Sequence, residues 1–164
     1  MNSCAIITSL TAGAVATLIM DLWSLFQRQI LGIPPLDYRL VGRWLSGICR
    51  GRFLHRTIIS TPPVPGERLI GWLAHYFTGL LFAFIPGGLA GEVWYSQPTL
   101  IPALAAGLLT LAFPLLVMQP AFGFGIAASR VPQPGRARLM SVLAHAVYGA
   151  GLYVAATSIT ALCQ

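Results

Sequence analysis

The sequence predicts an all-α integral membrane protein: a four-helix transmembrane bundle with a short amphipathic helix at the membrane interface. The first observation is composition, because the 164 residues are 56% hydrophobic and only 9% charged, whereas about a quarter of a soluble domain is charged. Such a composition also excludes a disordered chain. The second is the presence of four apolar stretches, each long enough to cross a hydrocarbon core of about 30 Å as a helix. The third is that these stretches do not alternate like the strands of a transmembrane barrel.

The four expected spans cover about residues 4–26, 69–91, 99–121 and 139–162. The first contains a single charged residue, Asp21, and the other three contain no Asp, Glu, Lys or Arg. Backbone groups in hydrocarbon must hydrogen-bond within their own segment, so each span is expected to be helical. Residues 14–16 resemble a signal-peptide cleavage site, but no positive charge precedes them, so we expect a retained first helix. Three prolines are expected to bend the third span: Pro102, Pro114 and Pro120.

The arginines predict the orientation in the membrane. All ten basic residues are arginine, seven in the connection of about 27–68 and three in that of about 122–138. Because cytoplasmic connections carry the excess of basic residues, we expect both connections in the cytoplasm and both termini outside. Residues 1–164 would form a single membrane domain. This placement accounts for the net charge of +6 without a nucleic-acid partner. The expected partners are anionic lipid headgroups, and a second copy or another membrane protein is compatible with the pattern.

The first connection contains the predicted amphipathic helix. Pro34 and Pro35 end the first span, and Asp37 suits the N-cap of a new helix. Apolar residues then recur at helical spacing through Ile48, which predicts a helix in the headgroup region near anionic lipid. The arginines here either anchor the topology or form a site for a phosphate or carboxylate, which Arg binds bidentately. The candidates for such an anion or headgroup site are Arg43, Arg50, Arg52 and Arg56.

The second and fourth spans share a pattern at an offset of 70 residues. Segments 62–79 and 132–149 are identical at seven of eighteen positions, including His75 with His145 and Gly79 with Gly149. Each half would contain two spans, so the halves would be parallel-related helical hairpins. In each half a glycine lies one turn beyond the histidine, which leaves room for a close helix or a bound group.

Four polar side chains are predicted to share one level of the bilayer: Asp21, His75, Gln119 and His145. Asp21, His75 and His145 each lie seven residues, or about 10 Å along a helix, from an arginine at the cytoplasmic boundary. Gln119 lies eleven residues before Arg130, near the same depth. A charged Asp there costs about 2.5–3.5 kcal/mol on insertion scales. We therefore expect these side chains to point inward and meet.

This polar level has three interpretations. The side chains could only hydrogen-bond helices together, or use the Asp–His pair to handle a proton, an ion or a small polar solute. They could also bind haem or a transition metal through Asp21, His75 and His145, although one carboxylate and no thiolate disfavour a metal, so no cofactor is expected. The leading function is the handling of a small solute or proton. The alternatives are a non-catalytic partner or assembly subunit and, third, a protein that binds lipid headgroups, haem or metal.

No Walker-type loop, dinucleotide fingerprint or His-Glu-x-x-His run is present. No nucleophile is recognisable either, which favours a protein that is not an enzyme.

Cys4 and Cys163 are expected near the external face, where a disulfide could form, and Cys49 is expected to be a free cytoplasmic thiol. Packing of small apolar residues at helix ends is the simpler interpretation of this pair.

Several motifs resemble a known family. They include residues 20–23 (MDLW), 32–34 (GIP), 41–44 (VGRW), 71–76 (GWLAHY) and 118–121 (MQPA). Over nearly the whole chain they resemble a bacterial family of small polytopic inner-membrane proteins catalogued as a domain of unknown function. Asp21, Arg43 and His75 lie inside these motifs. The resemblance implies location and architecture, and it carries no activity or binding residue.

Overall fold

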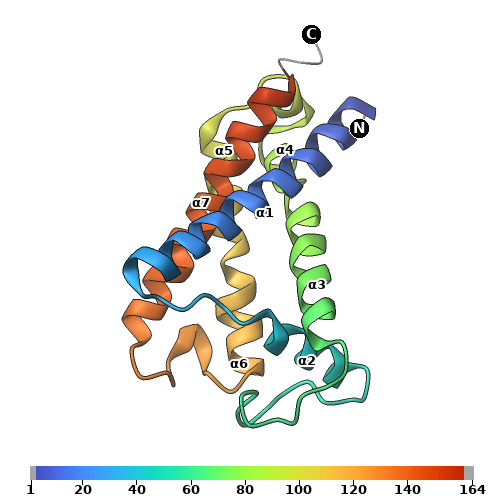
Figure 1. Ribbon diagram of the computed structural model, residues 1–164. Helices are drawn as coiled ribbons and strands as arrows, with labels where there is room; N and C mark the ends of the chain where they lie inside the picture. The colour runs from blue at the N-terminus through green and yellow to red at the C-terminus, as the bar shows by residue number, and fades with distance from the viewer. Residues whose placement is uncertain (1–2, 161–164) are drawn as a thin grey trace. The chain divides into compact units, whose positions relative to one another are not determined.

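The computed structural model describes residues 3–160, which form helices, turns and loops without any strand (Figure 1). The elements in chain order are α1 (Ser3–Leu31), α2 (Tyr38–Ile48), α3 (Glu67–Phe82), α4 (Ile85–Ala90), η1 (Glu92–Tyr95), α5 (Leu100–Thr110), η2 (Pro114–Met118), α6 (Gln119–Ala121), η3 (Ile126–Ala128) and α7 (Pro134–Thr160).

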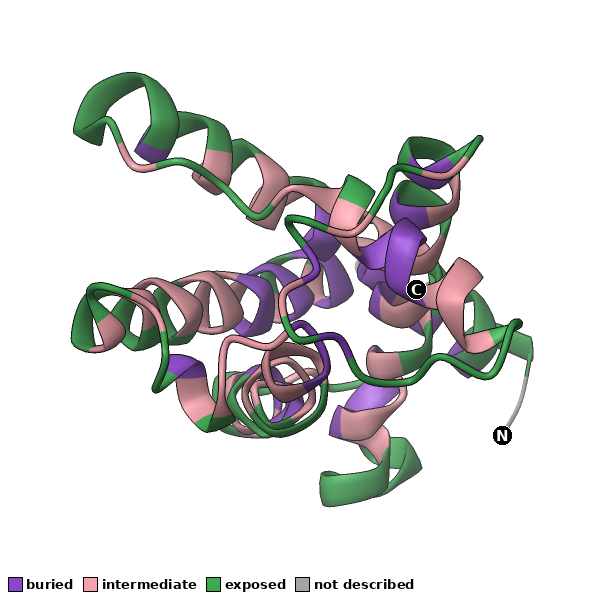
Figure 2. Ribbon diagram, turned by 90° about the horizontal axis from the view of Figure 1, so that it is seen from below, coloured by how far each residue is buried: buried purple, intermediate pink, exposed green. Residues whose placement is uncertain are grey.

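Four helical stretches are long and apolar enough to cross a membrane: Ser3–Leu31, Glu67–Ala90, Leu100–Ala121 and Pro134–Thr160. They overlap the four predicted spans, with ends that differ by up to five residues, and residues 161–162 of the last predicted span lie outside the described part of the chain. Many of their large apolar side chains remain exposed, as lipid-facing residues do, and green and pink run along much of the helices in Figure 2. The predicted all-α fold class is therefore confirmed, and the chain is a multi-pass membrane protein.

Two of these stretches are interrupted where proline removes a backbone donor. The helix after Glu67 breaks at Ala83–Phe84, just before Pro86, although the sequence had suggested one continuous helix to residue 91. The Pro86 ring crowds the carbonyl four residues earlier, which explains the break. In the third stretch Pro114 begins a π-helical turn, the irregularity expected there. Pro102 lies in the first turn of α5, where its missing N–H has no partner to lose.

The chain divides into two compact units. The first comprises Met1–Pro35, Tyr76–Thr110 and Val142–Gln164, and the second comprises Leu36–His75 and Leu111–Ser141. The expectation of a single membrane domain stays a prediction.

Small residues join the helices of the first unit. A methyl group added at Gly79 of α3 would overlap the Thr17 side chain of α1, and one added at Gly149 of α7 would lie 2.8 Å from the carbonyl oxygen of Ala103 in α5. Each of these two glycines therefore packs against the long helix that comes before its own helix in the chain. This close approach, which only glycine permits, is common in membrane helix pairs, and it is the arrangement expected of two related hairpins.

The second unit is organised by α2, which confirms the amphipathic helix expected in the first connection. Asp37 is its N-cap and accepts a hydrogen bond from the Arg39 backbone N–H at 3.0 Å. The hydrogen-bonded Arg39 side chain lowers the pKa of the Asp37 carboxyl. Val41 and Trp44 are buried against a small core that includes Ile58 and Phe122. The connection of residues 27–68 is thus largely folded and is no simple linker.

Candidate functional site

Asp21 lies within α1 and has a tyrosine partner from another helix. The Tyr76 hydroxyl of α3 donates a hydrogen bond to Asp21 Oδ2 at 3.0 Å. A polar group inside a span is costly unless it has a partner, and the Tyr76 hydroxyl is such a partner for Asp21. Tyr76 itself was not predicted from the sequence, because tyrosine is common in membrane helices and nothing in its spacing marked it.

His75, the next residue back along α3, is bound within the second unit. A hydrogen bond at 3.0 Å joins its Nε2 to the Tyr38 hydroxyl of α2, and the two rings stack with centroids 4.3 Å apart. Trp72 packs on the same tyrosine at 4.6 Å. Tyr38 reaches α3 because α2 runs close to it, with Gly71 directly against the Tyr38 carbonyl group. The predicted helix α2 therefore carries Tyr38, a partner of His75 that was not predicted from the sequence.

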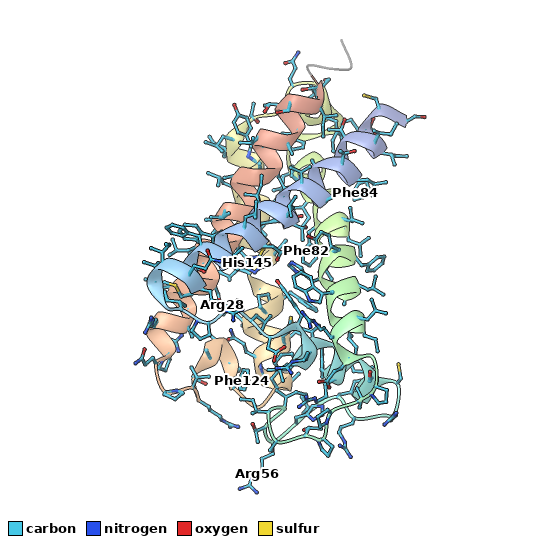
Figure 3. The ribbon with its side chains drawn as sticks, viewed as in Figure 1. Arg28, Arg56, Phe82, Phe84, Phe124 and His145 are labelled. Atoms are coloured by element: carbon cyan, nitrogen blue, oxygen red, sulfur yellow. The ribbon has the colours of Figure 1, made fainter. Side chains whose placement is uncertain are left out.

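His145 lies on α7 (Figure 3) and pairs with the preceding long helix. Its Nδ1 is 2.9 Å from Oγ1 of Thr110, the last residue of α5, and this hydroxyl also donates to the Gly107 carbonyl. Gln119, the fourth residue of the predicted polar level, has a buried side-chain oxygen with no hydrogen-bond partner in the described range 3–160. Each of the three ionisable side chains thus contacts a hydroxyl from another helix.

Arg43, one of the arginines predicted for an anion site, forms an ion pair within the second unit. Its side chain is buried, and Nε and Nη2 donate to the two carboxylate oxygens of Glu67 at 2.8 Å. Its Nη1 donates to the carbonyl oxygens of Ile58 and Thr61. The charge and donors of Arg43 are consequently occupied within the unit. Glu67 was not singled out from the sequence, although a lone acid at the start of a span, in a chain with ten arginines, is a signal for such a pair.

A cavity of about 280 Å³ lies beside this ion pair, between the carboxyl end of α2 and the loop that follows it. Its wall includes Arg43, Arg50, Arg52, His55 and Thr61. Three of the four arginines predicted as an anion site therefore meet at one cavity. Arg56 does not line it, and its side chain projects away from the loop in Figure 3.

His55 is the buried polar group of this cavity wall. Only 9% of the residue is exposed, and its Nδ1 lies 3.0 Å from the Thr61 hydroxyl. The other ring nitrogen, Nε2, has no hydrogen-bond partner among residues 3–160. Burial and then the neighbouring charges of Arg52 and Arg43 lower the pKa of His55, which favours the neutral ring.

Among residues 3–160, no group of three or more His, Cys, Asp or Glu side chains is placed to hold a metal ion. Cys49 is an exposed free thiol, as expected, while Cys163, the other half of the suggested disulfide with Cys4, lies outside the described residues.

A family model described as a protein of unknown function (DUF2938) matches residues 10–159. The chain belongs to this family. The resemblance to a family catalogued as a domain of unknown function is thereby confirmed, and the matched residues include Asp21, His75, Gln119 and His145 as well as the whole cavity wall. No curated protein and no solved structure matches the chain. The function therefore has to be argued from the geometry.

Proposed function

We propose that this DUF2938 protein resides in a bacterial inner membrane, with both termini outside and with residues 27–68 and 122–138 in the cytoplasm. The support is the position of all ten arginines in these two connections. An alkaline phosphatase fused to the carboxyl terminus should be active, and a fusion within residues 122–138 should be inactive. The opposite pattern would overturn the orientation.

We further propose that Asp21 is the centre of a polar intramembrane site that handles a proton or a small polar solute. The observation that carries this proposal is the Asp21 carboxylate inside α1 with the Tyr76 hydroxyl 3.0 Å away. Ionisable residues within spans are costly, and they commonly mark proton or solute pathways. Imidazole groups are common proton carriers in proteins, so His75 and His145, expected from the sequence at the same level as Asp21, suit this chemistry. Gln119 would supply a neutral hydrogen-bonding group, and no cofactor is invoked.

The second candidate is a non-catalytic partner or assembly subunit, in which these residues only hold helices together. The observation in its favour is that the ionisable side chains bond to hydroxyls on neighbouring helices. Elsewhere in the first unit, however, the Tyr148 hydroxyl donates to the Gly79 carbonyl oxygen at 2.6 Å. A neutral side chain thus joins two helices without an ionisable group. A purely structural Asp21 would be a costly way to make such a contact.

A hydrophobic carbodiimide distinguishes the two candidates, because it reacts with protonated carboxyl groups that it can reach from within the membrane. If Asp21 belongs to a working site, it should be modified in membranes. Peptide mass spectrometry would locate the label, and Asp21→Asn should abolish it. An Asp21 that stays unmodified in the folded protein would overturn the site and favour the structural alternative.

Proton movement provides the functional measurement. Liposomes with an entrapped pH-sensitive dye should equilibrate an imposed pH difference faster with the wild-type protein than without it. Asp21→Asn should remove the increase, and the control Tyr148→Phe should keep it even if the helices are less stable. Equal rates for the wild type and Asp21→Asn, or for the wild type and empty liposomes, would overturn the proton-handling version.

A further inference from the structure

The cavity beside Arg43 is lined by two arginines whose charges are not neutralised. Arg43 is neutralised by Glu67, but Arg50 and Arg52 have no ion-pair or hydrogen-bond partner for their side chains in the described range. Both are exposed at the cavity rim. Two uncompensated guanidinium groups on one small cavity attract an anion, and their planar donors match the oxygens of a phosphate group.

The orientation of donors within the cavity points the same way. The Thr61 hydroxyl donates to the Thr57 carbonyl oxygen at 3.2 Å, so towards His55 Nδ1 it can only accept. The ring proton of neutral His55 is therefore on Nδ1, and Nε2 carries a lone pair. A methyl group added at Gly47, another residue of the cavity wall, would lie 3.4 Å from Nε2, which places this nitrogen at the recess beside Gly47. A buried ring nitrogen without a partner is costly, and a ligand at the cavity would relieve that cost.

The surroundings of the cavity indicate the source of the anion. Three large apolar side chains of the same loop are exposed outside any span: Phe53 (59%), Leu54 (72%) and Ile59 (66%). Apolar side chains next to arginines are typical of segments that lie in the interface of an anionic membrane. The volume of about 280 Å³ falls just below the range of about 300–1,000 Å³ typical of drug-sized ligands, which suits one headgroup phosphate.

We propose that this cavity binds the phosphate group of an anionic phospholipid, with Arg50 and Arg52 as its charged ligands and His55 as a donor that forms on binding. The bound phosphate becomes the hydrogen-bond partner of His55 Nε2. The ring takes up one proton, so that Nε2 can donate a hydrogen bond to a phosphate oxygen. The apolar side chains of Phe53 and Leu54 enter the adjoining lipid. The site is independent of the intramembrane role of Asp21, and it requires only that the chain lies in a membrane.

Binding is expected to be linked to pH. The charged groups that face His55 are Arg43 and Arg52, with Glu67 paired to Arg43, and Arg50 lies on the same wall. The cations and burial keep the empty site neutral, and a phosphate offsets them, so the pKa of His55 is higher in the complex. Affinity therefore rises as the pH falls, by at most about tenfold per pH unit for one linked proton.

The test measures binding of short-chain phosphatidylglycerol, short-chain phosphatidylcholine and inorganic phosphate to the full-length chain in neutral detergent by calorimetry. Phosphatidylglycerol is a phosphodiester that does not titrate between pH 5 and pH 8, so a pH slope reports on the protein. We expect it to bind well above phosphatidylcholine, and we expect R50Q/R52Q to weaken it by about tenfold or more, since charge-assisted hydrogen bonds are lost. R56Q, which removes an arginine of the same loop outside the cavity, should change affinity less than about twofold.

A second variant tests His55. H55Q should leave affinity at pH 8 within about twofold of the wild type and abolish its increase towards pH 5.5. If R56Q weakens binding as much as R50Q/R52Q, the attraction is a general one of a basic surface and the cavity assignment is wrong. If inorganic phosphate binds as tightly as phosphatidylglycerol, the lipid assignment is wrong and the cavity takes a free anion. If phosphatidylglycerol does not bind, the proposal is overturned.

Discussion

The buried pair of Arg43 and Glu67 should be the most sensitive electrostatic contact of the second unit. Substitution of Glu67 by Met leaves the Arg43 guanidinium buried with only two carbonyl oxygens as acceptors. The carboxylate also accepts a backbone hydrogen bond from Val64 at 3.0 Å, which is lost as well. Removal of one partner of a buried ion pair costs about 3–5 kcal/mol. Because the pair borders an open cavity that water can enter, we expect a loss of about 3 kcal/mol, at the lower end.

The measurement is the free energy of unfolding from a denaturant titration in mixed micelles, followed by circular dichroism. The double variant R43M/E67M should be more stable than the sum of the single variants implies, because it leaves no unpaired charge. The control is Arg39→Gln, which removes an ion pair whose arginine is exposed while the Asp37 cap remains. It should be indistinguishable from the wild type. If Glu67→Met costs no more than Arg39→Gln, or if the single losses simply add, the role assigned to the pair is refuted.

Three further predictions concern helix contacts, capping and pH. Gly149→Ala should destabilise the chain by about 1–3 kcal/mol, because the added methyl would meet the Ala103 carbonyl, whereas Gly88→Ala, which faces open space, should be neutral in the same denaturant titration. Asp37→Ala should lower helicity and cost about 1 kcal/mol of unfolding free energy through loss of the α2 cap, and an unchanged titration curve would contradict the capping role. Burial lowers the pKa of His55 in the folded chain. Below about pH 6.5 the unfolded chain therefore binds a proton at His55 that the folded chain does not, and stability falls. His55→Gln should make the thermal unfolding midpoint less dependent on pH between pH 7.5 and pH 5.5.

The spans and α2 could be predicted because each depends on local chemistry. A run of about 20 apolar residues in hydrocarbon must form a helix to satisfy its backbone hydrogen bonds. Asp37 followed by apolar residues at helical spacing marks the start of α2. The break before Pro86 could not be predicted in the same way. Proline in membrane helices is often accommodated, and whether the helix continues depends on tertiary packing.

The candidate site was predictable in its residue types but not in its pairings. Arg50 and Arg52 stood out as a basic cluster, yet the cavity that joins them to His55 depends on how the loop returns to the core. Backbone hydrogen bonds from His55 N to the Ala121 carbonyl and from Ile58 N to the Phe122 carbonyl hold that loop. These contacts join residues more than sixty positions apart, and no spacing rule reveals them. Arg43 was grouped with its neighbours for the same reason, since only the fold reveals Glu67 as its partner.

The two histidines at equivalent positions of the predicted repeat have different partners. Gly79 and Gly149 pack against their preceding helices in the same manner, but the counterpart of α2 at the repeat offset would fall within the third span. His75 therefore has Tyr38 of α2 as its partner through Nε2, and His145 has a threonine of α5 through Nδ1. Haem ligation through His75 Nε2 would require this tyrosine bond to break, so the pair is poorly suited to serve as two like axial ligands. The geometry instead favours separate hydrogen-bonded roles, in which proton transfer or helix contact uses each histidine with its own hydroxyl.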